Sequence, residues 1–305
     1  MSITSDWFYP ELNNIKHKWQ KFVTSCYIVG GRMTALLVDN YGVPFGLKLI
    51  NGKPRVSSMP YLFDVAEGNV PDHAGFFCTG ERSAVAAVAT GVDIWRGTAN
   101  VIPIPVDAGE QLEVISTSLA DDGAPPGTGI RTVHIDYLDA AGVEQEEEVI
   151  LNGTAAVALN ETNVRFVNGF HAQTVGAGGV AAGDITLYLQ GSPLVVYSRI
   201  TTGSNQDLSS QKMIPAGHTF YMTQWVAAAT ASKPIALRMR MTQMHNVLMP
   251  GVFIVHNVAW LQDGAMVHDF NVPIKIPPLT IIKVTGYATQ AGANVSASYS
   301  GWIET

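Results

Sequence analysis

The sequence contains few charged residues. Asp, Glu, Lys and Arg make up only 14% of its 305 residues, whereas soluble domains usually carry roughly 25%. Hydrophobic residues make up 47%, which is an ordinary share. Charge therefore covers less of the surface than usual. Contacts between subunits would hide part of the remaining surface, because the centres of protein interfaces are depleted in charge.

The chain also lacks the basic excess that binding to nucleic acid requires. Its formal net charge is −7, and neutralising phosphates needs clustered Lys and Arg. We therefore expect no nucleic-acid partner. Residues 1–60 are mildly basic, with seven basic and three acidic side chains, whereas the rest of the chain has eleven and twenty-two. Either the basic part of one subunit meets an acidic neighbour, or these charges form a solvated helix face.

Cysteine and long apolar runs are scarce as well. Cys26 and Cys78 are the only cysteines, too few for a disulfide scaffold, so we expect two free thiols. The first six residues have no basic and apolar leader pattern, and no uncharged apolar run approaches the ~20 residues of a membrane span. The sequence thus predicts a soluble protein, made in a cytoplasm, with no membrane partner.

Common catalytic signatures are missing. The sequence has no G-x-S-x-G elbow, no H-E-x-x-H helix, no C-x-x-C pair and no phosphate-binding P-loop. The glycine-rich run at 176–179 lacks the G-x-G-x-x-G spacing and is interpreted as a hairpin loop. We therefore predict a non-enzymatic protein with no catalytic residues and no cofactor.

Histidines offer the nearest approach to metal chemistry. His134 and Asp136 would share one face of a strand as two ligands. A structural zinc ion is usually bound by about four protein ligands and a catalytic zinc ion by about three, and no third ligand candidate is near in the sequence. The pair is interpreted as solvent-facing polar side chains, and no metal is predicted.

Two acidic segments have similarly plain interpretations. The loop at Asp121 and Asp122 lacks the acidic spacing of an EF-hand loop. The run of Glu144, Glu146, Glu147 and Glu148 fits a solvated strand edge better than a pair of catalytic carboxylates, because charge on an edge deters unwanted sheet pairing.

Most of the chain has the alternating pattern of β-strands. In residues 131–139 and 235–242 apolar and polar side chains alternate, which predicts strands with one buried and one wet face. Further short strands separated by Gly and Pro turns are predicted at 111–118, 146–151, 163–172, 184–189, 194–200, 219–227, 252–260, 279–287 and 295–303. The sequence predicts an all-β protein whose body, residues 92–305, is an antiparallel β-sandwich or jelly roll. Two packed sandwiches dividing near residue 215 are an alternative.

Residues 1–91 are predicted to form a short helix, hairpins and a connecting segment. Residues 26–59 contain hairpin signals such as Asn51-Gly52, and residues 60–91 are less regular. A helix is predicted after Pro10, because apolar side chains there have the spacing of one helix face. This face either packs on its own domain or attaches the chain to a neighbouring subunit; its residues are Leu12, Ile15, Trp19, Phe22 and Val23.

One pair of segments resembles a known family. Phe63-Asp-Val-Ala-Glu-Gly-Asn-Val-Pro-Asp-His73 is followed by Val92-Asp-Ile-Trp-Arg-Gly97, and this combination resembles structural proteins of tailed bacteriophages of aquatic bacteria. The likeness extends over residues 60–305, through 114–118, 130–138, 166–168 and 214–225. The family's Lys-Phe-Gly-like stretch is replaced here by Phe76-Phe77-Cys78-Thr79-Gly80. The motifs carry no catalytic residues.

The resemblance implies a non-enzymatic virion structural protein. Such a subunit would lie on the capsid surface as a decoration or cement protein, or at the neck or tail. Its partners would be other virion proteins and copies of itself, in a trimer by analogy with phage appendages. The alternative is a receptor- or glycan-binding fibre subunit. A third hypothesis, a polysaccharide-cleaving enzyme, needs paired carboxylates. Trp95, Trp225, Trp260 and Trp302 lie in apolar contexts that favour core packing over glycan contact.

Overall fold

The computed structural model describes residues 61–68, 70–242 and 252–305, together with six short strands between residues 26 and 56. The chain divides into two compact units, Met1–Asp64 and Val65–Thr305. Apart from the one-and-a-half-turn helix α2 (Tyr61–Ala66), the regular structure of the described residues consists of β-strands. The predicted all-β antiparallel fold is therefore confirmed. No helix in the described part of the chain is long and apolar enough to cross a membrane.

The first unit contains three antiparallel hairpins. In the third, Ile50 lies opposite Lys53, as the Asn51-Gly52 signal predicts. The helix predicted after Pro10, with its attachment face, lies outside the described residues. The strands are β1 (Cys26–Val29) with β2 (Arg32–Ala35), β3 (Leu37–Val38) with β4 (Pro44–Phe45), and β5 (Leu47–Ile50) with β6 (Lys53–Val56).

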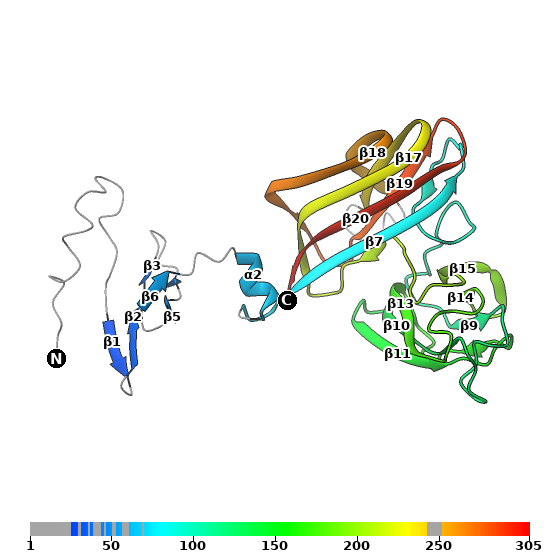
Figure 1. Cartoon of the computed structure of the whole chain (residues 1–305), viewed down its shortest axis with the longest axis horizontal. Helices are drawn as coiled ribbons and strands as arrows, with labels where there is room; N and C mark the ends of the chain where they lie inside the picture. The colour runs from blue at the N-terminus through cyan, green and yellow to red at the C-terminus, as the bar shows by residue number, and fades with distance from the viewer. Residues whose placement is uncertain are drawn as a thin grey trace. The chain divides into compact units, whose positions relative to one another are not determined.

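The second unit is built on a seven-stranded antiparallel sheet (Figure 1). Its path runs β16-β19-β17-β20-β7, while β18 pairs with β17 and β8 with β19. The strands are β7 (His73–Val85), β8 (Val92–Asp93), β16 (Gln211–Met213), β17 (Thr219–Thr242), β18 (Phe253–Ile276), β19 (Ile281–Ala288) and β20 (Ala293–Glu304).

Strand β17 pairs with three other strands of this sheet. Its first half pairs with β20 and its second half with β19, while β18 follows it along both halves. The register shifts between Thr230 and Ile235, where Pro234 cannot donate to the ladder. The strands predicted at 219–227 and 235–242 are thus one strand of 24 residues. The sheet curls so that the two ends of its path, β7 and β16, come together. The backbone N–H of Glu81 on β7 donates to the carbonyl of Leu208, which lies just before β16 (3.2 Å). Its core includes Phe220, Trp225 and Tyr299.

A smaller β-sandwich is inserted between β8 and β16. One sheet has the order β11-β10-β13 and the other β12-β9-β14-β15. Both sheets contribute to one buried apolar cluster, so they pack face to face. The chain leaves this sandwich at Ile200 and enters the large sheet again at Gln211. The strands are β9 (Leu112–Ser116), β10 (Ile130–Leu138), β11 (Glu144–Ile150), β12 (Val157–Ala158), β13 (Phe166–Val175), β14 (Ile185–Leu189) and β15 (Ser192–Ile200).

The prediction that residues 60–91 only connect the two parts is wrong for 73–85. These residues form β7, which pairs with β20 over its length. Glycines inside the strand hide its alternation in the sequence, and one of them is required by a close approach. A Cβ atom on Gly80 would lie 2.3 Å from the Ser210 backbone nitrogen, so only glycine lets the two ends of the curled sheet meet here.

The segment Val92–Gly97, which carries part of the phage resemblance, contains buried residues that bond to other parts of the fold. Asp93 is 1% exposed and forms an ion pair with Lys283 (2.9 Å). Trp95 is 1% exposed, and its Nε1–H donates to the Ala99 carbonyl (3.0 Å). A Cβ atom on Gly97 would lie 1.9 Å from the Trp95 ring. The motif thus has a packing role in this chain.

Candidate functional site

Strand β18 is an edge of the large sheet. Among the described strands it pairs only with β17, so its other side has no neighbouring strand. An edge strand presents unpaired N–H and C=O groups, which can pair with another chain. With 24 residues, β18 is much longer than the short edge strands by which proteins normally limit such pairing.

The first half of β18 also lacks protecting charge. Residues 253–262, which we call the uncharged edge run, include no Asp, Glu, Lys or Arg. Four apolar side chains of this run are exposed, namely Ile254, Val255, Val258 and Trp260. The second half differs, since it contains Asp269, Lys275 and Pro273. Proline is tolerated there because an edge strand has one unpaired side. The uncharged edge run is therefore the part of β18 best suited to pair with another strand.

Strand β11 is another edge strand, and unlike the uncharged edge run it is rich in charged side chains. It is the outer strand of the three-stranded sheet, and Glu144, Glu146 and Glu148 are all exposed along it. The predicted solvated edge is thus confirmed for these three residues, whereas Glu147 is only partly exposed and accepts hydrogen bonds from the Asn160 backbone N–H and side-chain amide (both 2.8 Å). Pairing two such edges would place carboxylates opposite carboxylates, which is unfavourable.

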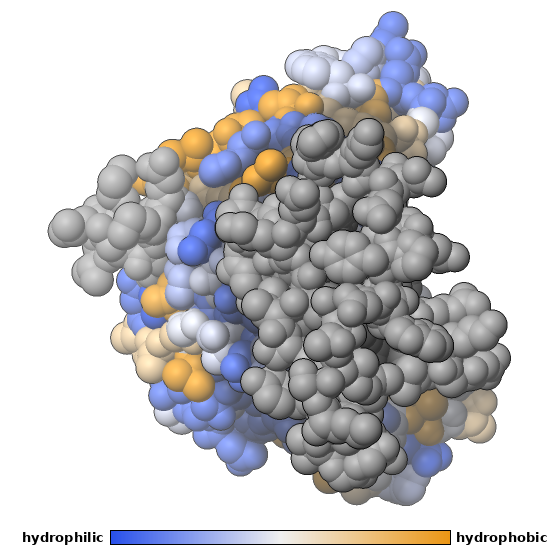
Figure 2. Space-filling view, turned by 90° about the vertical axis from the view of Figure 1, so that its left-hand side faces the viewer, coloured by the Kyte–Doolittle hydropathy of each residue, from blue (hydrophilic) through white to orange (hydrophobic). Residues whose placement is uncertain are grey.

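Figure 2 shows apolar residues gathered in the upper part of the view, at the height where β17 and β18 lie in Figure 1. The exposed apolar residues of β18 outside the uncharged edge run include Val267 and Val272, with 60% and 80% of their surface exposed. Apolar side chains thus occur along both halves of the edge strand. Contiguous exposed apolar surface of this kind marks interaction sites.

The four tryptophans of the described residues separate into two groups. Trp95 and Trp225 are buried, as predicted, and Trp302 stacks on Tyr221 with ring centroids 5.1 Å apart. Trp260 is 63% exposed, so the core prediction is wrong for this residue. Its strand pattern is that of a buried strand, but no layer of described residues covers its face of β18, and a local pattern contains no information about covering layers.

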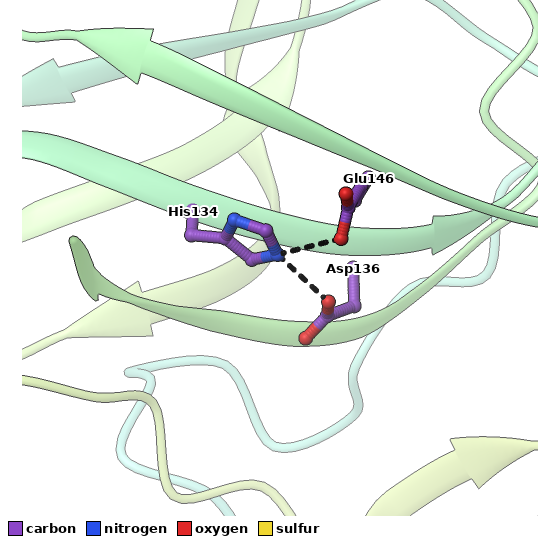
Figure 3. A group of neighbouring side chains, drawn as sticks. All are labelled: His134, Asp136 and Glu146. Atoms are coloured by element: carbon purple, nitrogen blue, oxygen red, sulfur yellow. Dashed lines mark hydrogen bonds and ion pairs between the residues drawn. The ribbon is translucent and has the colours of Figure 1, made fainter.

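A second candidate site lies on the outer face of the sandwich. His134 and Asp136 lie two residues apart on β10, and Asp136 is directly opposite Glu146 on β11. His134 Nε2 is 3.0 Å from Asp136 Oδ1 and 3.6 Å from Glu146 Oε2. Figure 3 shows both carboxyl groups turned toward this one ring nitrogen. Strand pairing thus supplies the third ligand candidate that is not near in the sequence. We call these three residues the His134 cluster.

The surroundings of the His134 cluster are set by β13. His171 lies opposite His134, and their ring centroids are 4.9 Å apart. Gly169 lies opposite Asp136, and a Cβ atom on it would be 2.1 Å from Asp136 Oδ2. The glycine therefore leaves the space that the Asp136 carboxylate occupies. The Nδ1 atom of His134 is buried and has no hydrogen-bond partner among the described residues.

The Asp121 carboxylate is already used within the protein. Asp121 is completely buried, and its two oxygens accept hydrogen bonds from the backbone N–H groups of Ile130, Ala182 and Gly183 and from the Ser116 hydroxyl, at 2.6–2.9 Å. This carboxylate joins the loop between β9 and β10 to the loop between β13 and β14. The prediction that the loop is not an EF-hand site agrees with this arrangement.

An open hollow of about 620 Å³ lies beside Trp95 and Gly97. Its lining is polar and includes Arg82 and Arg96. Arg82 donates to the Ala99 carbonyl (2.7 Å), and Arg96 forms an ion pair with Glu81 (2.9 Å) and donates to Ser204. Both guanidinium groups thus already have partners within the protein.

Comparisons with known proteins do not assign the chain to a family. No family model matches it, and no curated protein matches it. A solved structure described as that of infectious bursal disease virus Gt strain is 13% identical over 80% of this chain and 77% of the other, with a TM-score of 0.12. A TM-score of this size does not indicate a shared fold.

Proposed function

We propose that this chain is a non-enzymatic structural subunit of a bacteriophage particle, on the capsid surface or at the neck or tail, and that it assembles with copies of itself through β18. The observation that carries the assembly part is the uncharged edge run, which leaves backbone pairing groups and four apolar side chains exposed. Natural proteins normally cover or charge such an edge. The phage part is supported by the sequence resemblance.

The occupant of this edge is a second copy of the chain. Two copies of one strand can pair antiparallel about a two-fold axis, since the same patch then serves both subunits. The uncharged edge run places no like charges opposite each other in such a pair. Instead, Val258 and Trp260 of one copy lie near apolar side chains of the other, and apolar cross-strand pairs stabilise sheets. The same pairing at β11 would bring glutamates together.

The full-length chain tests this assembly. Two-fold pairing gives a dimer in place of the trimer expected by analogy. We therefore expect sedimentation equilibrium to give a dimer of the 32.7 kDa chain, and Val258→Lys to give a monomer, because two lysines would meet near the axis. Val258 is 42% exposed, so the variant keeps its melting temperature apart from the loss of dimer stabilisation. The matched control is Ile150→Lys, at a 60% exposed position on β11, which stays dimeric. A monomeric wild type, or a dimeric Val258→Lys variant, would contradict the pairing.

Membership of a virion needs a separate measurement. Antibody against the chain should label purified particles in negative stain, at the head surface, neck or tail. Absence of the chain from purified virions would contradict the phage proposal and leave the dimer result unaffected.

One observation favours the glycan-binding alternative. The Trp260 ring is 63% exposed, and exposed aromatic rings are typical contacts for sugars and other ligands. A glycan array distinguishes the two functions: saturable binding that Trp260→Ala abolishes supports a fibre or receptor-binding subunit, whereas no binding at all supports a purely structural one.

A further inference from the structure

The His134 cluster has the geometry of a metal site. Residues two apart on a strand share one face, and directly paired residues on neighbouring strands do too. His134, Asp136 and Glu146 therefore project from the same side of the β10–β11 pair. Their ligand atoms all lie within 4.8 Å of one another. Bonds of about 2.1 Å to nitrogen and oxygen place the ligand atoms of a tetrahedral site roughly 3.4 Å apart, close to the observed 3.0 and 3.6 Å.

The charges at the site favour a cation. In the part of the chain that the structure describes, the ion pairs of Asp136 and Glu146 are both with His134. Glu144 and Glu148 lie further along the same face of β11, opposite Leu138 and His134. Neighbouring carboxylates on paired strands repel one another. A divalent cation between Asp136 and Glu146 would remove this repulsion and fasten the edge strand β11 to β10.

The donor atoms select the kind of cation. One imidazole nitrogen with two carboxylate oxygens suits zinc and similar transition metals, whereas calcium and magnesium take oxygen ligands alone. The Asp136 and Glu146 side chains are 49% and 79% exposed, so solvent reaches the site and water completes the coordination. We infer that His134, Asp136 and Glu146 bind one divalent transition-metal cation of the zinc class.

The second shell sets the expected strength of binding. When a metal bonds to Nε2 of a histidine, the proton stays on Nδ1, which normally donates to an acceptor. His134 Nδ1 is buried without such a partner among the described residues. Loss of a second-shell partner weakens metal affinity by roughly 10–100-fold. We therefore expect weaker binding than at a site whose histidine has such a second-shell partner.

Calorimetric titration of the full-length chain with zinc chloride, after removal of metals with a chelator, tests the site. We expect one zinc bound per chain and a rise in melting temperature with zinc concentration. Glu146→Gln should weaken this binding at least ~10-fold. Because the Glu146 side chain is 79% exposed, this variant should melt like the wild type when no metal is present.

The matched control is Glu148→Gln, two residues along the same face of β11. It removes the same charge from the same strand but no ligand of the proposed site, so zinc binding should weaken much less than in Glu146→Gln. The absence of zinc binding to the wild type would overturn the inference. Equal weakening by the two substitutions, or equally strong binding of magnesium, would overturn it as well, since both results indicate a diffuse acidic surface only.

Discussion

Asp207 lies in the loop between β15 and β16; the residue is partly exposed, but its carboxyl group is withdrawn from water. Its Oδ2 accepts a hydrogen bond from the Ser198 hydroxyl (2.7 Å), while its Oδ1 is buried without a partner among the described residues. Burial raises the pKa of this carboxyl to about 7, although Ser198, Arg96, the Leu208 backbone N–H and Lys212 oppose the shift. The folded protein therefore holds a proton on Asp207 that the unfolded chain releases near pH 4.

This shift predicts a pH-dependent stability. The protonated Asp207 carboxyl makes its full contribution to the free energy of unfolding below the unfolded pKa. This contribution is lost as the pH rises from about 4 to about 7, because the unfolded chain then releases the proton while the folded protein still holds it. At 1.36 kcal/mol per pKa unit, the loss is at most about 4 kcal/mol. We expect Asp207→Asn, measured by urea unfolding, to gain stability relative to wild type between pH 5 and pH 8. The exposed control Asp263→Asn should show no such trend; a pH-independent difference for Asp207→Asn would contradict the assignment.

Cys78 shows the same effect of burial on a thiol. It is 1% exposed, and its Sγ–H donates to the Ser209 carbonyl (3.1 Å). Burial raises the pKa of the thiol to about 11, so little reactive thiolate forms at neutral pH. The predicted free thiol is confirmed for Cys78, whereas the Cys26 side chain lies outside the described structure.

At the scale of elements, the short strand β8 is attached to β19 by a buried ion pair. Asp93 accepts hydrogen bonds from Lys283 Nζ (2.9 Å) and the Thr285 hydroxyl (3.1 Å). It also accepts one from the Ile102 backbone N–H (3.0 Å). The Asp93 and Lys283 side chains are 2% and 5% exposed. Breaking such a pair leaves an uncompensated charge in the interior, while replacing both partners avoids that charge.

We therefore expect Asp93→Ala to lower the free energy of unfolding by about 3–5 kcal/mol in a urea titration. The double variant Asp93→Ala/Lys283→Met should recover part of this loss. A partly exposed pair supplies the control: Glu81→Ala, which breaks the ion pair with Arg96, should change the unfolding free energy by less than about 1 kcal/mol. Equal effects of Asp93→Ala and Glu81→Ala would show that burial of the pair is unimportant.

At the scale of the whole molecule, the described apolar clusters all lie in the second unit. Its terminal strand β20 lies between β17 and β7, and the Thr305 backbone N–H donates to the Asp72 carbonyl (3.0 Å). The end of the chain is therefore part of the sheet, as the pattern of residues 295–303 predicts. Removal of the first unit should therefore affect the stability of the protein much less than removal of β20.

A chain that begins at residue 61 should keep the cooperative melting of the full-length protein, within about 2 °C, because the clusters of the second unit remain complete. A chain that ends at residue 290 should not fold, because removal of β20 exposes one side of β17 and leaves β7 without the strand it pairs with. Calorimetry of both truncated chains measures this. Loss of the cooperative transition in the first truncation would contradict the division into two units.

Much of the fold could be predicted from the sequence, and much less of the candidate sites. Alternation in residues 131–139 predicts β10, because period two is a local property of the backbone. The continuous path of β17 through Pro234 and the strand character of β7 could not be predicted, because these depend on neighbours distant in the sequence. Glu146 joins His134 only through the β10–β11 register.

The sequence by itself determined the strand-rich composition, the hairpin turns, the low charge and the lack of common catalytic signatures. These are properties of single residues and of short local periods. Only the tertiary structure decided that β18 is an edge, that Trp260 is exposed, and that an imidazole and two carboxylates meet on one face. The physical reason is that the exposure of a strand and the contacts of its side chains both depend on which other strands pair with that strand. In a sheet closed by long-range contacts, the paired strands come from distant parts of the chain.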